Sequence, residues 1–62
     1  MSETLLRHPD VEARTGLARS TIYKWISEGG FPSPVRLGGR VVAWRASEIE
    51  AWIEAQTEAR AA

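Results

Sequence analysis

The spacing of apolar and polar residues predicts two short helices in the first half of the chain. The first covers residues 9–15, where Pro9 fits the first helical turn and Gly16 can adopt the left-handed conformation that ends a helix. The second covers residues 20–28, with Ser20 as its N-cap. Its apolar residues follow the i, i+3, i+4 spacing of one buried stripe: Ile22, Trp25 and Ile26. Helices this short are not stable alone, so the pair is expected to pack as a helix-turn-helix.

The next segment predicts a β-hairpin, or wing, over residues 35–44. The Gly-Gly pair at 38–39 favours a two-residue turn, which pairs Val35 with Val42. The apolar residues of both strands then share one face: Val35, Leu37, Val42 and Trp44. Arg36 points to the other face. A three-residue loop would reverse the faces of the second strand, and we favour the two-residue loop because it buries the tryptophan.

A third helix is expected from Ser47, which forms a capping box with Glu50 three residues later. Its apolar stripe consists of Ile49, Trp52 and Ile53. The tail from about Gln56 is rich in alanine and charged residues and is expected to fray. These elements predict one domain over residues 1–62, mainly α with a small β-hairpin. Three short helices and a two-stranded wing make up a winged helix-turn-helix.

Composition narrows the function classes. The chain has 62 residues, no cysteine and one histidine, so we expect no disulfide, no metal site and no cofactor. No catalytic constellation or phosphate-binding glycine loop is present, and we expect no enzymatic activity and no small-molecule substrate. Nothing resembles a signal peptide or a membrane span, which predicts a cytoplasmic protein without a membrane partner.

Charge is distributed unevenly although the net charge is zero. Residues 14–45 contain six basic side chains against Glu28 alone, and both flanking segments are acidic. A basic segment between acidic flanks is the electrostatic footprint expected of a protein that binds nucleic acid.

Three motifs in order carry a family resemblance: TGLARSTIY across the turn, FPSPVRLGGR into the wing, and VAWRASEIEAWI into the last helix. Together with LLRHPDVEAR upstream, they resemble the AlpA family of phage and prophage regulators, which is similar to excisionases and MerR-like winged-helix domains. The chain departs from the family pattern at Ala18, where serine is frequent, and at His8. The resemblance implies a small DNA-binding protein, either a transcriptional regulator or an excision factor of a prophage or mobile element.

The candidate DNA-binding residues lie on the second helix, just before it, and on the wing: Arg19, Ser20, Thr21, Tyr23, Lys24, Arg36 and Arg40. The helix is expected in the major groove, and the wing on the backbone or minor groove. Alternatively, Ser20 only caps the helix, Lys24 is only solvated, and the wing arginines only protect exposed strand edges. We expect Arg45 to form a salt bridge with the third helix. The tryptophans are expected in the core rather than stacked on bases, and His8 is given no function.

Double-stranded DNA is therefore the expected partner of this nucleoid-associated protein. Further copies of the chain on adjacent DNA repeats, and an integrase or recombinase, are additional expected partners. The alternative is a small adaptor that docks a recombinase or polymerase through its acidic C-terminal helix. Steep salt dependence of binding to duplex DNA would favour the first interpretation.

Overall fold

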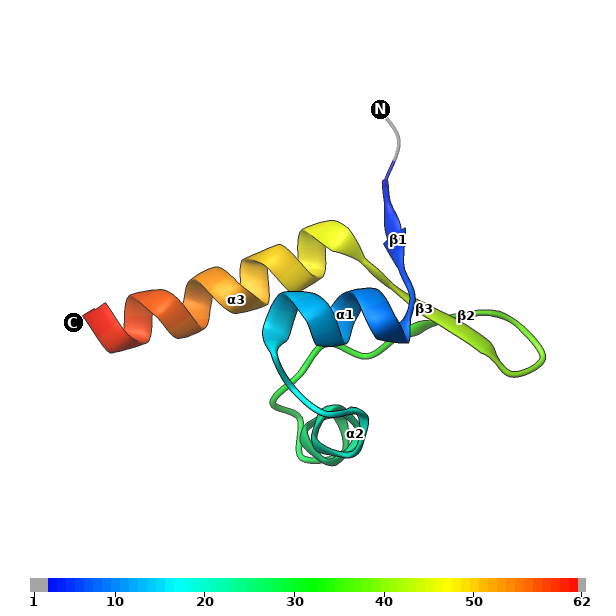
Figure 1. The fold of residues 1–62 in the computed structure, drawn as a ribbon, viewed down its shortest axis with the longest axis horizontal. Helices are drawn as coiled ribbons and strands as arrows, with labels where there is room; N and C mark the ends of the chain where they lie inside the picture. Colours follow the sequence, from blue (N-terminus) through cyan, green and yellow to red (C-terminus); the bar gives the residue numbers. More distant parts are fainter. Residues whose placement is uncertain (1–2, 62) are drawn as a thin grey trace.

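Six elements make up the part of the chain that the structure, a computed structural model, describes, residues 3–61. In chain order they are β1 (Leu5–Leu6), α1 (His8–Thr15), α2 (Arg19–Ser27), β2 (Val35–Gly38), β3 (Val41–Arg45) and α3 (Ala46–Ala61) (Figure 1). The predicted fold class is confirmed: two short helices precede a hairpin and a third helix. None of the helices between residues 3 and 61 is long and apolar enough to cross a bilayer.

The sheet has a third strand that the sequence pattern did not predict. β1 pairs antiparallel with β3, with Leu5 opposite Arg45 and Leu6 opposite Trp44, so the strand order is β1-β3-β2. Two residues are too few to show an alternating pattern, which is why the strand was not expected. The pairing holds the N-terminal segment against the C-terminal end of β3, the end of the wing that lies opposite its turn.

The start of α3 differs from the predicted capping box. The helix begins at Ala46, whose N–H donates to the Thr4 carbonyl at 2.8 Å. The Ser47 hydroxyl and N–H both donate to the Glu3 carboxylate, at 2.6 and 3.3 Å. An acidic residue from the other end of the chain therefore caps this helix and complements its dipole, in place of Glu50. α3 continues to Ala61, and fraying of its tail stays a prediction.

The helix boundaries of the helix-turn-helix are close to those predicted. Gly16 has φ 74° and donates its N–H to the Glu12 carbonyl, which confirms it as the left-handed residue that ends α1. α2 starts one residue earlier than expected, at Arg19, with Ala18 as N-cap and no side-chain cap. The assignment of Ser20 as N-cap is therefore wrong, and Ser20 lies exposed in the first helical turn.

The register of the wing, the β2–β3 hairpin over residues 35–45, was predicted wrongly. Val35 lies opposite Ala43 and Arg36 opposite Val42, with an irregularity between Arg36 and Gly38. The turn residues are Gly39 and Arg40. Gly38 adopts φ 147°, a conformation that glycine allows, and β2 therefore contains one residue more than β3 before the turn. Leu37, expected in the core, is 52% exposed.

The apolar core lies between α1, α2, β3 and α3. Its largest fully buried side chains are Trp44, Ile22, Ile49 and Val11. Trp44 is buried as predicted although the register differs, and its indole N–H donates to the Pro32 carbonyl at 2.9 Å. Trp52 donates to the Gly30 carbonyl at 2.8 Å, and its ring packs edge-on against Phe31. The two indoles thus fix the loop between α2 and the wing.

Candidate nucleic-acid interface

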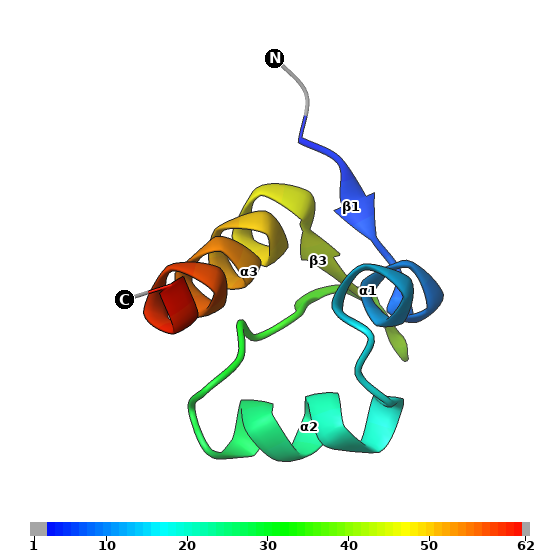
Figure 2. The same cartoon turned by 60° about the vertical axis from the view of Figure 1, so that its left-hand side comes forward.

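The helix α2 lies along one edge of the molecule (Figure 2), and its Trp25 ring faces the Trp52 ring of α3 with their centres 6.0 Å apart. Its inner side is anchored by Ile22, which is fully buried, while Ser20 and Lys24 are exposed and Thr21 is half-buried. Because Ala18 provides no side-chain cap and Ser20 does not act as one, the Ser20 hydroxyl is accessible on the helix surface. The outward side of α2 thus presents short polar side chains and one lysine.

The wing carries its arginines on exposed positions. Arg36 shares a face with Val42, its cross-strand partner, and does not point to the opposite face as the sequence suggested. Arg40 occupies the turn after Gly39, whose φ of 53° favours glycine. Both guanidinium groups are at positions that solvent reaches.

A polar pocket joins α2 to the wing. We call it the arginine pocket. Its lining residues with charged or polar side chains are Arg7, His8, Arg19, Tyr23 and Arg40. Pro9 and Val42 complete the lining. The structure therefore brings three of the predicted residues, Arg19, Tyr23 and Arg40, to one place. Ser20, Thr21, Lys24 and Arg36 do not line this pocket.

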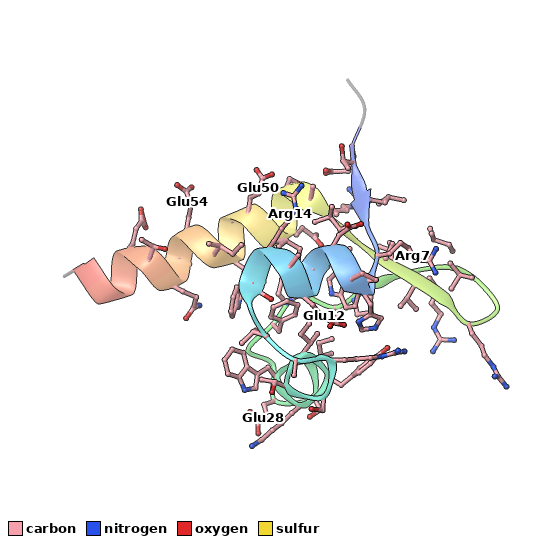
Figure 3. The ribbon with its side chains drawn as sticks, in the orientation of Figure 1. Arg7, Glu12, Arg14, Glu28, Glu50 and Glu54 are labelled. Atoms are coloured by element: carbon pink, nitrogen blue, oxygen red, sulfur yellow. The ribbon has the colours of Figure 1, made fainter. Side chains whose placement is uncertain are left out.

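Two members of the arginine pocket, Arg7 and His8, were not predicted. The sequence contained little signal for them, because their position follows from the pairing of β1 with β3. That pairing places the β1–α1 junction against the wing, and Figure 3 shows Arg7 at the wing end of α1. If β1 had been predicted as a strand of the wing sheet, Arg7 and His8 would have been expected next to the wing.

Tyr23 and His8 connect this surface to the core. The His8 Nε2 atom and the Tyr23 hydroxyl are 2.9 Å apart in a hydrogen bond, and the His8 ring packs edge-on against Trp44. On its other side, the Tyr23 ring has the Arg19 guanidinium 5.9 Å from its centre. Tyr23 is 43% exposed, so it contributes both to packing and to the surface.

Burial lowers the pKa of the His8 imidazole below its ordinary value of 6.5. The nearby charges of Arg19 and Arg7 lower this pKa further, while the Glu12 carboxylate, 3.9 Å from Nδ1, opposes them. The Nδ1 atom is buried and has no hydrogen-bond partner in the described structure. His8 is therefore mainly neutral at neutral pH, first because it is buried and further because of the charges of Arg19 and Arg7.

Acidic side chains lie on other parts of the surface. Figure 3 shows Arg14 beside Glu50, Glu54 on the exposed side of α3, and Glu28 at the end of α2. The Arg14 guanidinium is 3.5 Å from the Glu50 carboxylate, which links α1 to α3. The predicted salt bridge from Arg45 to the third helix is absent among the described side chains, and the ion pair to that helix comes from Arg14. Residues 3–61 contain no group of three or more side chains suited to hold a metal ion.

Two packed short helices followed by a β-hairpin and a third helix define a small winged helix-turn-helix domain. Residues 4–57 match the family model described as prophage CP4-57 regulatory protein (AlpA), and the chain belongs to this family.

Two relatives are similar over most of the chain. Protein ORF88 of Enterobacteria phage P4 is 48% identical over 58 residues, which are 94% of this chain and 66% of that protein. The chain thus spans slightly less than two thirds of the phage protein. The DNA-binding transcriptional activator AlpA of Escherichia coli strain K12 is 38% identical over 55 residues, 79% of each chain.

Proposed function

We propose that this protein binds double-stranded DNA sequence-specifically and regulates the transcription of prophage or mobile-element genes, as a cytoplasmic, nucleoid-associated protein without enzymatic activity. The observation that carries the proposal is that α2 and the wing meet at the arginine pocket, so that helix and wing can contact one duplex together. The relative from Escherichia coli named as a DNA-binding transcriptional activator supports the same function.

In this proposal α2 enters the major groove. The helix spans Arg19–Ser27, or about 13 Å at ~1.5 Å per residue, and the major groove is about 12 Å wide. Thr21 and Lys24 are one turn apart on the outward part of α2, where they would reach base edges. Ser20 would donate its free hydroxyl to a base or phosphate.

The wing would contact the flanking backbone or minor groove. Arg40 sits at the turn, at the furthest reach of the hairpin, and Arg36 lies on the face it shares with Val42. Val42 lines the arginine pocket, so this face is the one next to α2. Arginine is favoured in narrow, strongly negative minor grooves, which makes these two side chains suited to that position.

The acidic side chains would orient the protein on DNA. Glu50 is paired with Arg14, and Glu54 is exposed on α3, away from the wing (Figure 3). A phosphate backbone attracts the arginine side of the molecule and repels this side of α3. The same acidic surface could contact the basic wing of a neighbouring copy on an adjacent DNA repeat, or a recombinase if the protein also acts as an excision factor.

Selection from a pool of randomised duplexes tests the proposal. The protein is expected to enrich one short motif, and footprinting on the selected duplex should show occupation of adjacent repeats. The variant Glu54→Gln is the matched control, because it alters α3 only and should enrich the same motif. Recovery of unrelated sequences would refute sequence-specific binding. A changed motif with Glu54→Gln would show that α3 takes part in recognition.

A further inference from the structure

The arginine pocket has the composition of an anion site. Three arginines from three parts of the fold line it: Arg7 from the β1–α1 junction, Arg19 from the first turn of α2, and Arg40 from the wing turn. Its cavity measures about 250 Å³. One water molecule occupies ~30 Å³ in the liquid, so the cavity has room for a larger, hydrated group.

No acidic side chain neutralises these arginines in the part of the chain whose side chains are described, residues 3–58. One ion pair is found there, between Arg14 and Glu50, and the Glu12 carboxylate lies 3.9 Å from the mainly neutral imidazole of His8. No carboxylate lines the pocket, and all three arginines are exposed. Like charges that line one pocket repel each other, and a ligand with negative charge would relieve this repulsion.

We propose that the arginine pocket binds one phosphate group of the DNA backbone between Arg7, Arg19 and Arg40, at the junction of α1, α2 and the wing. This inference rests on the proposed function and adds Arg7 and His8 to the interface. Guanidinium groups suit phosphate because their planar donors form paired hydrogen bonds to its oxygens. A phosphate held here would fix the angle between α2 in the groove and the wing beside it.

The hydrogen bond between Tyr23 and His8 gives this site a dependence on pH. When the imidazole is neutral and its Nε2 accepts, the Tyr23 hydroxyl donates its proton inward to His8. When the imidazole is protonated, Nε2–H becomes the donor, and the hydroxyl is free to donate to the phosphate. Protonation of His8 thus adds one donor to the pocket.

Bound phosphate in turn favours the protonated histidine. In the free protein, burial and then the charges of Arg19 and Arg7 lower the pKa of His8, against the opposing charge of Glu12. A phosphate on these arginines offsets their charge, so the pKa of His8 rises on binding. A higher pKa in the complex means that binding takes up protons, and affinity therefore increases as the pH falls from the pKa of His8 in the complex toward its lower pKa in the free protein.

The first experiment compares Arg7→Gln with Arg14→Gln on a duplex selected by the wild-type protein. Both variants remove one arginine charge at an end of α1, but only Arg7 lines the pocket. Arg7→Gln is expected to weaken binding about threefold to tenfold for all sequences and to reduce the salt slope by about 1. Arg14→Gln should change neither quantity by as much.

The outcomes separate the two proposals. Equal effects of the two variants would overturn the phosphate site while leaving DNA binding intact. Failure of the wild-type protein to bind any duplex would overturn both. Replacing single phosphates by neutral methylphosphonates identifies the source of the bound phosphate: at one position the replacement should weaken the wild type clearly more than Arg7→Gln, which has already lost one of the three arginine contacts. If no position does so, and inorganic phosphate alone shifts the His8 and Tyr23 ring resonances, the pocket binds free phosphate and the DNA assignment is wrong.

The second experiment measures affinity from about pH 8 downward through the titration of His8, the only histidine of the chain. The wild type should bind several-fold more tightly at the lower pH, within the limit of about tenfold per pH unit for one proton. His8→Gln, which keeps a polar group beside Tyr23, should show a flat profile. Tyr23→Phe, which keeps the titrating His8 and loses only the hydroxyl, should show a shallower pH dependence than the wild type. Unchanged pH dependence in either variant would overturn the coupling between His8, Tyr23 and the phosphate.

Discussion

Replacing Trp44 by alanine is expected to unfold the domain or nearly so. Trp44 is completely buried, between the His8 ring at 4.8 Å on one side and the Phe31 ring at 6.5 Å on the other. Its indole N–H also donates to the Pro32 carbonyl. The substitution leaves a cavity in contact with β1, α1 and the loop before the wing.

The expected loss can be compared with the total stability. Truncating a buried tryptophan costs about 3–5 kcal/mol, from lost apolar burial and the cavity left behind. At about 0.05–0.15 kcal/mol per residue, a chain of 62 residues has a free energy of unfolding of about 3–9 kcal/mol. Much or all of the stability is therefore lost with one side chain.

Thermal and urea unfolding, followed by circular dichroism, measure this loss. A domain of this size changes its melting temperature by about 4–8 °C per kcal/mol, so Trp44→Ala should lower it by more than about 12 °C or abolish the transition. Trp44→Phe keeps most of the volume and loses the hydrogen bond to Pro32, and should fall between. Leu37→Ala, at a wing position that is 52% exposed, is the control and should change little. A shift of only a few degrees for Trp44→Ala would refute the described core.

The remaining predictions concern recognition, pH and assembly. Thr21→Ala and Lys24→Ala should change which sequences are enriched from randomised duplexes, whereas Arg40→Ala should weaken all sequences about equally, because base contacts specify and phosphate contacts position. Glu3→Gln should lower the melting temperature at neutral pH. The hydrogen bond from Ser47 lowers the pKa of Glu3, so its stabilising effect is present above its ordinary value of 4.5 and is lost as the pH falls through the lowered pKa. Sedimentation should show a monomer at micromolar concentration, with cooperative occupation of adjacent repeats only on DNA, because exposed ion pairs between copies are weak.

Each of these expectations has a clear contrary result. A changed base preference with Arg40→Ala and not with Lys24→Ala would make the wing the element that recognises sequence. Equal melting temperatures of wild type and Glu3→Gln from neutral pH to about pH 3 would show that Glu3 does not cap α3 in solution. A stable dimer without DNA would contradict assembly on adjacent repeats.

Local patterns in the sequence were sufficient to predict the helices. Ile22 and Ile49 lie on the predicted stripes and are fully buried, and Gly16 ends α1 as expected. Of the predicted site residues, Arg19, Tyr23 and Arg40 converge on one pocket. These features depend on spacing within a few residues, which sequence shows directly.

Features that depend on distant partners were missed. Glu3 caps a helix that starts more than forty residues later. β1 is a strand only because its two residues pair with β3. The predicted wing register was wrong because the turn begins at Gly39 and Gly38 belongs to β2. Local sequence pattern does not decide which of two adjacent glycines begins the turn. Arg7 was not predicted as a site residue and His8 was given no function for the same reason, since their place in the pocket follows from the pairing of β1.

The central claim, that α2 and the wing together contact duplex DNA, is tested most directly by nuclear magnetic resonance. Backbone amide resonances of the labelled protein would be followed while a selected duplex is added. The account predicts the largest shifts at residues 19–24 and 36–42, with further shifts at Arg7 and His8 and small ones at residues 50–58. Largest shifts on α3, or none on α2 and the wing, would contradict it.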